Sequence, residues 1–151
     1  MKSFEIEGVI VQPLEQIEGN CGRVLRMLRS DSSLFNQFGE IYFSEIYPGM
    51  INAWKQHKQQ TQNLTVPFGS IRLVIYDNRS ASSTRGKIKE YELGRPENYK
   101  LIHIPPMLWY GFQEIGNQTS MIANCPDQPH DPGEAESKPA DSSQIPYQWK
   151  T

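Results

Sequence analysis

The fold is decided by two neighbouring runs of sequence, LTVPFG at residues 64–69 and IRLVIY at residues 71–76. Both runs are short and rich in the branched and aromatic residues that favour strands. Gly69 ends the first run, and DNRS at residues 77–80 ends the second with residues typical of turns. This stretch therefore predicts two consecutive β-strands.

Further short runs of the same kind lie on both sides of this stretch. They occupy residues 4–11, 23–29, 38–47, 50–54, 87–93, 101–104, 110–112 and 120–124. Turn-forming pairs such as Pro48-Gly49 and Pro105-Pro106 separate them. No segment has the periodicity of a capped helix beyond one or two turns. Roughly ten strands at a spacing of ~8–12 residues predict an all-β sandwich or barrel.

Length and composition favour one domain with a distinct C-terminal segment. A chain of 151 residues can bury a core of its own, and we expect a single domain over residues 1–151. Residues 126–145 contain four prolines and a mostly acidic charge set, which indicates a segment that covers the body or is disordered. Tyr147 and Trp149 beyond it favour docking, because aromatic side chains gain from burial.

Charge and cysteine content exclude several classes of partner. The 15 Lys and Arg residues against 17 Asp and Glu give a net charge of −2, which argues against nucleic acid or an anionic membrane as the main partner. No apolar run approaches the ~18 residues of a membrane span, and the acidic N-terminal residues are unlike a secretory signal. Cys21 and Cys125 are expected to be reduced, buried thiols of a cytoplasmic protein.

Three stretches combine residues that could carry chemistry. WKQHK at residues 54–58 offers His57 as a general base beside two lysines that could hold an anionic substrate; a solvated loop is the alternative. IPPMLWYGF at residues 104–112 could line a pocket for a sugar or a base, or fill a corner of the core. In NCPDQPHDPGE at residues 124–134, His130 could transfer a proton, or the stretch could be a hydrophilic loop.

We expect neither a metal nor a cofactor. The three histidines form no His-x-His pair and the two cysteines lie far apart in sequence, whereas a tight metal site needs several convergent ligands. The sequence also lacks a Gly-x-Gly-x-x-Gly motif, a Walker sequence and a Gly-x-Ser-x-Gly nucleophile elbow.

The sequence resembles a known family in the order in which these stretches occur. The order is EIYFS at residues 40–44, PG at 48–49, INAWKQH at 51–57, VPFG at 66–69, DNRSASSTRG at 77–86, IPP at 104–106 and GF at 111–112. From Ile6 to Trp149 it resembles the dTDP-4-dehydrorhamnose 3,5-epimerases and their dTDP-sugar ketoisomerase relatives. The resemblance implies a cupin, a double-stranded β-helix or jelly-roll barrel, that is homodimeric, uses no catalytic metal and binds a nucleotide-linked sugar.

The resemblance also assigns roles to single residues. The proton-abstracting histidine of the family corresponds to His57, its second pocket histidine to Tyr110, and the aspartate that orients the base to Asp141. The family's lysine falls near residue 62 or 63 and its catalytic tyrosine within PDQP at residues 126–129, so this sequence lacks both.

Together these observations predict a sugar-nucleotide epimerase or isomerase that removes a proton α to the ketone of a nucleoside-diphosphate 4-keto-6-deoxy sugar. His57 is the expected base, oriented by Asp141 or Asp77, and Tyr110 and His130 are candidate acids. The candidate substrate-binding residues are Glu40, Tyr42, Trp54, Lys55, Lys58, Arg72 and Trp109. The cations among them would meet the pyrophosphate.

Two alternatives stay open. A non-catalytic nucleotide-sugar or carbohydrate-binding cupin in polysaccharide biosynthesis fits the missing lysine and tyrosine. A metal-dependent cupin that acts on a small molecule is the third interpretation.

Overall fold

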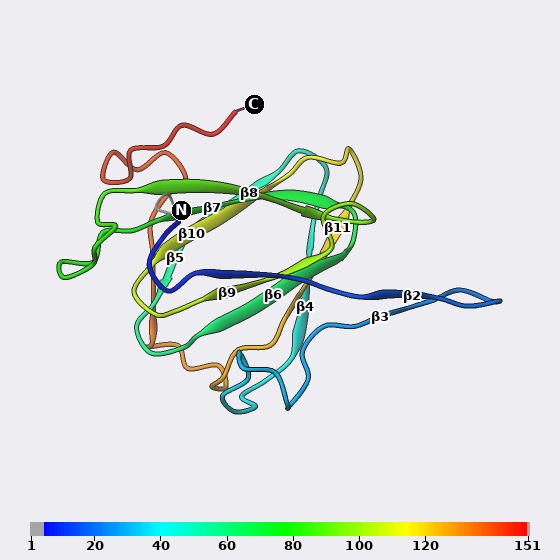
Figure 1. Ribbon diagram of the computed structural model, residues 1–151. Helices are drawn as coiled ribbons and strands as arrows, with labels where there is room; N and C mark the ends of the chain where they lie inside the picture. Colours follow the sequence, from blue (N-terminus) through cyan, green and yellow to red (C-terminus); the bar gives the residue numbers. More distant parts are fainter. Residues whose placement is uncertain (1–4, 151) are drawn as a thin grey trace.

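The computed structural model describes residues 5–150, which form two antiparallel sheets that face each other (Figure 1). The first sheet contains, in spatial order, β1 (Ile10–Pro13), β9 (Lys100–Ile104), β6 (Gln62–Phe68), β11 (Ser120–Asn124) and β4 (Tyr42–Ile46). The second contains β12 (Ala135–Ser137), β5 (Ile51–His57), β10 (Trp109–Glu114), β7 (Ser70–Tyr76) and β8 (Ile88–Gly94). A separate hairpin pairs β2 (Gln16–Glu18) with β3 (Arg23–Leu25).

The prediction of an all-β fold is confirmed, because residues 5–150 contain strands and no helix. It follows that this part of the chain has no helix that could cross a membrane. The strands β2 and β12 were not predicted, since their sequences QIE and AES contain only one apolar residue each. The run expected over residues 4–11 becomes a strand only at Ile10, and Phe4 lies outside the described residues.

The two runs that decide the fold lie in different sheets. β6 belongs to the first sheet and β7 to the second, so the chain crosses between the sheets at Gly69. Gly69 has a φ of 87°, and a Cβ atom there would lie 2.0 Å from Oγ of Ser120. Ser120 Oγ also accepts the backbone N–H of Ser70 at 3.0 Å. Glycine is therefore required at this corner by both its backbone conformation and the close approach of β11.

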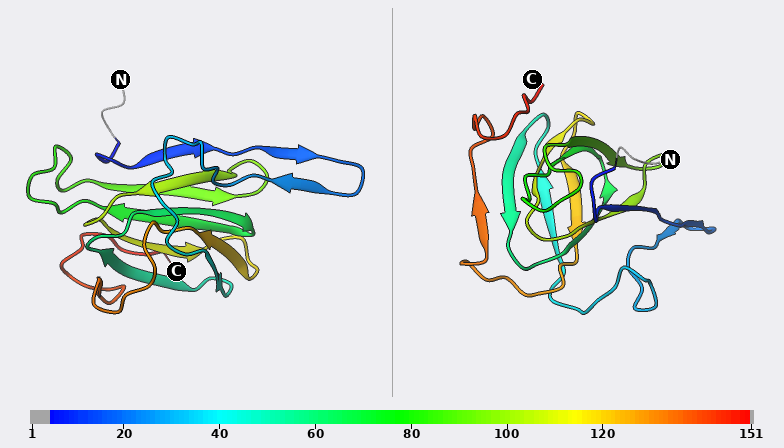
Figure 2. Two further views of the ribbon diagram at one scale, coloured as in Figure 1. Left: turned by 90° about the horizontal axis from the view of Figure 1, so that it is seen from below. Right: turned by 60° about the vertical axis from the view of Figure 1, so that its left-hand side comes forward.

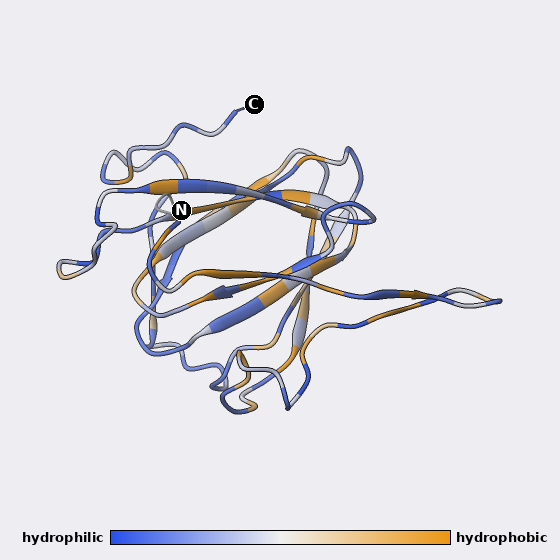
Figure 3. Cartoon of the chain, in the orientation of Figure 1, coloured by the Kyte–Doolittle hydropathy of each residue, from blue (hydrophilic) through white to orange (hydrophobic). Residues whose placement is uncertain are grey.

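Both faces of β7 are covered, which explains why its sequence is almost continuously apolar. Ile71, Leu73 and Ile75 point between the sheets and join the main core. Val74 and Tyr76 point outward into a second cluster. Figure 3 shows apolar and polar positions interleaved along the strands.

The C-terminal residues 138–150 (red in Figure 1) cover the outer face of the second sheet. Trp54 of β5 contacts Trp149 and Tyr147 there, with ring centroids 5.2 Å and 6.0 Å away. The Tyr147 hydroxyl donates to Glu90 at 2.7 Å. Tyr147 and Trp149 thus dock as expected, and they do so on the sheet's outer face.

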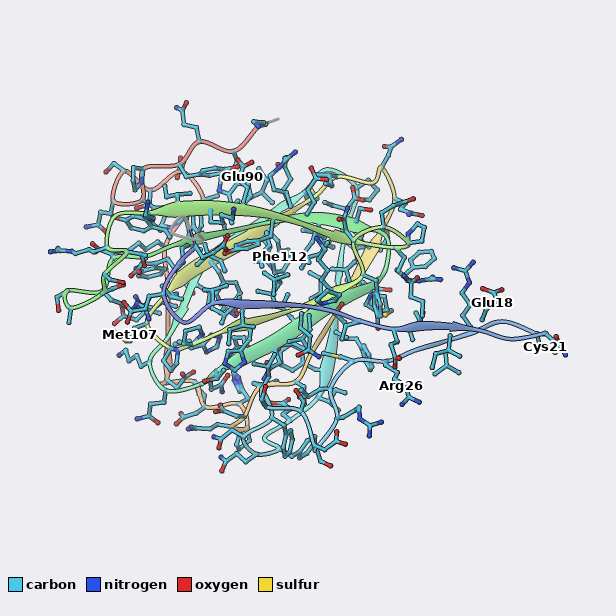
Figure 4. All side chains as sticks on the ribbon, in the orientation of Figure 1. Glu18, Cys21, Arg26, Glu90, Met107 and Phe112 are labelled. Atoms are coloured by element: carbon cyan, nitrogen blue, oxygen red, sulfur yellow. The ribbon has the colours of Figure 1, made fainter. Side chains whose placement is uncertain are left out.

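The hairpin of β2 and β3 projects away from both sheets (Figure 2). Glu18 and Arg26 lie along it and Cys21 lies at its tip (Figure 4). The expectation that both cysteines are buried is therefore wrong for Cys21, which is exposed on the projecting hairpin, and right for Cys125. The side chains of Ile17 and Val24 are 40% and 59% exposed. The hairpin therefore presents apolar side chains to the surroundings.

Candidate active site

The end of β5 carries inward-facing polar residues because a bulge resets its alternation. Ala53 and Trp54 together oppose the single Gly111 of β10. A Cβ atom on Gly111 would lie 2.4 Å from Cβ of Ala53, so glycine makes room for the bulge. The side chains of Ala53 and Trp54 both pack in the outer cluster, although these residues also border the cavity that Asn52 and Lys55 line. The extra residue thus turns both flanking segments of β5 toward the interior.

His57, the last residue of β5, makes two contacts through its imidazole ring. Its Nδ1 atom lies 2.7 Å from Oε1 of Glu134, and its Nε2 atom lies 3.3 Å from the hydroxyl of Tyr110. The Tyr110 and His57 rings are nearly parallel, with centroids 6.1 Å apart. All three residues are buried. The ring is therefore fixed between a carboxylate and a phenol.

The carboxylate of Glu134 determines which ring nitrogen carries the proton. Burial by itself would raise the pKa of Glu134, but hydrogen bonds from His57 and from the backbone N–H groups of Gln59 and Gln60 hold this pKa below 4.5. An ionised carboxylate only accepts hydrogen bonds, so Nδ1 of His57 donates to it. The lone pair of Nε2 is then available on the side of Tyr110.

Tyr110 is held in its protonated form. Burial raises the pKa of its hydroxyl, and the nearby Tyr42 and Glu134 raise it further. A protonated phenol can donate to the lone pair of His57 Nε2. The pair therefore combines a proton acceptor with a proton donor, which is what a proton-transfer site needs.

Two adjoining cavities border this group. One of about 280 Å³ is lined by Glu40, Tyr42, Lys55, His57, Gln60, His130, Asp131, Pro132, Glu134 and Ala135. The other, of about 190 Å³, is lined by residues of β4, β5, β10 and β11 that include Tyr110 and Asn124. Tyr42 and Lys55 line both cavities. A ligand in one cavity would therefore be in reach of residues in the other.

Comparison with known proteins gives the family. The family model described as dTDP-4-dehydrorhamnose 3,5-epimerase matches residues 5–151. The chain belongs to this family. The expected resemblance and the expected class of activity, a sugar-nucleotide epimerase or isomerase of the cupin fold, are thereby confirmed.

Three members show how close the relationship is. A dTDP sugar isomerase from Desulfovibrio desulfuricans G20 superposes with a TM-score of 0.94 at 49% identity, over 95% of this chain and 92% of that one. The probable low-salt glycan biosynthesis epimerase Agl13 of Haloferax volcanii is 32% identical, over 94% of this chain and 88% of its own length. The spore coat polysaccharide biosynthesis protein SpsL of Bacillus subtilis is 30% identical, over 97% of each.

Seven of the residues expected in the epimerase site border the two cavities. They are His57, Tyr110, Glu40, Tyr42, Trp54, Lys55 and His130. Oε1 of Glu40 accepts the backbone N–H of His130 at 3.0 Å, which fixes the loop that carries this exposed histidine. Lys55 has no ion-pair partner among the residues the structure describes.

The orienting residue expected at Asp141 or Asp77 has to be corrected. Asp141 is exposed and borders a different cavity, formed with the C-terminal residues on the outer face of the second sheet. Asp77 is fully buried and bonded to Arg79, Ser82 and Thr84. The carboxylate that contacts His57 belongs to Glu134.

Three expected substrate-binding residues, Trp109, Arg72 and Lys58, line neither cavity. The rings of Trp109 and Trp54 belong to the aromatic cluster on the outer face, although Trp54 also borders the 190 Å³ cavity. Arg72 alternates with the inward-facing Ile71 and Leu73, and its guanidinium lies 3.4 Å from Gln113. Lys58 pairs with Glu136 at 3.4 Å and lines neither cavity.

Sequence reasoning missed Glu134 because it is far from His57 in the chain. The signal available was its place directly after the turn residues Pro132-Gly133, before a short extended run. Reasoning also missed Asn124 and Gln60, which look like ordinary polar residues at strand ends. The pairing of β11 with β6 and β4 brings Asn124 to the cavities, and bonds to Glu134 and Pro129 hold Gln60 there.

The structure offers no obvious metal site. Among residues 5–150, no three His, Cys, Asp or Glu side chains converge as a metal-binding group. The expectation that catalysis uses neither a metal nor a cofactor stays a prediction.

Proposed function

We propose that this epimerase-family enzyme removes a proton α to the ketone of a nucleoside-diphosphate 4-keto-6-deoxy sugar, with His57 as the base. The observation that carries the proposal is the buried contact between Glu134 and His57 Nδ1, which leaves the lone pair of Nε2 facing the Tyr110 hydroxyl. A C–H bond next to a ketone is acidic enough for an imidazole to accept its proton when the enolate is stabilised.

Lys55 is the group we assign to the developing enolate oxygen or the pyrophosphate. Its side chain lines both cavities, and it precedes His57 by two positions, so both face the interior. An ammonium group there would stabilise negative charge that develops on the substrate. Lys55 would thus replace the family's lysine, whose position falls near Gln62.

Tyr110 is the first candidate for returning the proton, and His130 the second. Inversion requires the sugar ring to lie between the two side chains, so substrate would displace the direct contact between Nε2 and the Tyr110 hydroxyl. His57 would then take the proton from one face of the carbon, and the Tyr110 hydroxyl would protonate the enolate from the other face. Once the product has left, the 3.3 Å contact re-forms and the phenolate recovers a proton from the imidazolium. The cycle leaves each residue in its starting state, and inversion needs no further reactant.

A non-catalytic binding protein is the second candidate function. Gln62 stands near the position of the family's lysine and is held in hydrogen bonds to other amides, and the family's catalytic tyrosine is absent from residues 126–129. A binder would keep the cavities and lose the chemistry.

Deuterium exchange separates these two functions. The protein is incubated in D2O with dTDP-, UDP- and GDP-linked 4-keto-6-deoxy sugars, and incorporation is followed by NMR and mass spectrometry. We expect deuterium at C3 or C5 with the wild type and none with His57→Asn, whereas His103→Asn, which alters a histidine that lines neither cavity, should retain exchange. Thermal stabilisation by a sugar without any exchange would show that the protein only binds.

The same proposal includes the assembly and the setting of the enzyme. We propose a homodimer of single-domain chains, because the hairpin exposes Ile17 and Val24, and Phe43 and Phe68 are 60% and 57% exposed on the outer face of the first sheet. We also propose a cytoplasmic location, supported by two free cysteines, and neither nucleic acid nor membrane as partner. Sedimentation equilibrium tests the dimer.

A further inference from the structure

A chain of three amide side chains crosses the first sheet beside the candidate active site. Gln60 Nε2 donates to the carbonyl oxygen of Pro129 at 3.1 Å, and Gln62 Nε2 donates to Gln60 Oε1 at 3.1 Å. Asn124 Nδ2 then donates to Gln62 Oε1 at 2.6 Å. The three amide residues are 4%, 1% and 4% exposed. Buried polar groups of this kind keep a fixed arrangement, because each broken bond leaves an unpaired group.

The direction of the donors in this chain is fixed at one end. The backbone carbonyl of Pro129 can only accept, so the end of Gln60 that faces it must be the NH₂ group. The carbonyl end of Gln60 must then accept from Gln62, and the carbonyl end of Gln62 must accept from Asn124. Turning any one amide around would place two acceptors or two donors against each other. Asn124 is thereby held with its Nδ2 group toward β6.

This polarity leaves one acceptor and one donor unused at the cavities. The Nδ2 group of Asn124 also donates to the hydroxyl oxygen of Tyr42, at 3.0 Å. Oδ1 of Asn124 is buried and accepts no hydrogen bond from the residues the structure describes. The Tyr42 hydroxyl already accepts, so its own proton is available to donate. Both residues line the cavity that adjoins Lys55 and Tyr110.

We propose that Asn124 and Tyr42 form a recognition site for one ring hydroxyl of the sugar, with Asn124 Oδ1 accepting its proton and Tyr42 donating to its oxygen. A hydroxyl is the group that donates and accepts at the same atom. A ketone oxygen would leave Oδ1 unpaired, and an ammonium group could not accept from Tyr42.

This inference deepens the proposed function, on which it rests for the class of substrate. It gives a role to the residue near the family's lysine position. Gln62 does not line either cavity, yet it orients Asn124. The neutral amide that stands near the lysine position would therefore help to bind a sugar hydroxyl.

The test compares the affinities of substrate analogues for the wild type and for variants. Binding of dTDP-6-deoxyglucose and of its 2-deoxy and 3-deoxy analogues is measured by calorimetry with the wild type, with Asn124→Leu and with Ser44→Ala. Ser44 lines the same cavity and has no assigned role, so Ser44→Ala is the matched control. Exchange into the corresponding 4-keto sugars is measured in parallel.

For the wild type we expect one of the two deoxy analogues to bind roughly 10- to 100-fold more weakly than the parent sugar, because it leaves polar groups unpaired. Ser44→Ala should show the same discrimination. Asn124→Leu should bind the parent and that analogue equally. Equal binding of all three sugars by the wild type, which needs no variant to fold, would overturn the inference, as would undiminished discrimination by Asn124→Leu.

The outcomes for the inference and for the proposed function are distinguishable. Discrimination in binding without deuterium exchange would support the hydroxyl site and contradict catalysis. Exchange without discrimination would support catalysis and leave Oδ1 of Asn124 to a bound water. If none of the three dTDP sugars binds, the substrate class fails and the hydroxyl site fails with it.

Discussion

Nδ1 of His57 and Oε1 of Glu134 lie 2.7 Å apart at the edge of the second sheet, where β12 pairs with the end of β5. The other carboxylate oxygen of Glu134 accepts the N–H groups of Gln59 and Gln60 at 2.9 Å and 2.8 Å. These backbone bonds fix the carboxylate, and the carboxylate fixes the imidazole. The segment after β5 therefore orients the base at its end through a residue that is distant in sequence.

The first prediction concerns this contact. Glu134→Gln should reduce the rate of deuterium exchange by about 10²- to 10⁴-fold, because an amide can present its NH₂ group to Nδ1 and stabilise the wrong tautomer. The melting temperature is measured in parallel to separate this effect from unfolding. A folded Gln variant with wild-type exchange would remove Glu134 from the mechanism.

A second prediction separates the removal of the proton from its return. Tyr110→Phe keeps the aromatic ring but removes the hydroxyl next to His57. We expect exchange of the C–H proton to continue while the yield of inverted sugar falls by about 10²-fold or more. The ratio of exchange to epimerisation is read by NMR in D2O. An unchanged ratio would transfer the role of acid to His130, which His130→Asn would then test.

The two lysines near His57 provide a matched pair for a third prediction. Lys55 lines both cavities, whereas Lys58 forms a surface ion pair with Glu136. Lys55→Ala should lower kcat/KM for exchange by about 10²-fold, since it removes a charge that stabilises the enolate or the pyrophosphate. Lys58→Ala should have little effect, because exposed ion pairs contribute little. The reverse ranking would contradict the proposed role of Lys55.

The fold was accessible from sequence because strands depend on local pattern, and short apolar runs between turn residues predicted the strands around Gly69. The candidate base was accessible through the family resemblance, in which His57 takes the place of the proton-abstracting histidine. The strands β2 and β12, with one apolar residue each, gave no such signal.

Whether each of the remaining residues belongs to the site depends on which face of its strand it occupies. Trp54 and Lys55 are neighbours in sequence but lie on opposite faces of β5, and the bulge opposite Gly111 sets which of them faces the cavity. The periodicity of one strand does not reveal the register in which its partner strand pairs with it. Glu134 likewise required the pairing of β12 with β5, a contact between segments far apart in the chain.

A fourth prediction concerns the C-terminal cover. Trp149 is half-buried against Trp54 and Tyr147, and its Nε1 atom is buried without a hydrogen-bond partner among residues 5–150. Trp149→Ala should lower the free energy of unfolding by about 2 kcal/mol, less than for a fully buried tryptophan. Trp149→Phe should cost much less, because it keeps a ring and removes the unpaired N–H. Urea unfolding, with the exposed Gln148→Ala as control, gives both values.

Glu114 provides the last prediction, on stability at acid pH. It is 2% exposed, and its carboxylate accepts the N–H groups of Gly49, Gly116 and Gln118 and the hydroxyl of Ser120. Burial alone would raise the pKa of Glu114, but these donors outweigh burial and hold its pKa below the usual 4.5.

Because the pKa of Glu114 is lower in the folded state, acid pH destabilises the fold. The unfolded chain binds the proton more tightly than the folded one, so the stabilisation is complete above pH 4.5 and is lost as the pH falls through the lower pKa of the folded state. Glu114→Gln should cost about 2–3 kcal/mol at neutral pH, because charge-assisted bonds are lost and an NH₂ group faces N–H donors. The difference between wild type and variant should shrink on acidification. Urea unfolding at several pH values measures it, with the exposed Glu97→Gln as control; a difference that stays constant with pH would show that the charge of Glu114 does not stabilise the fold.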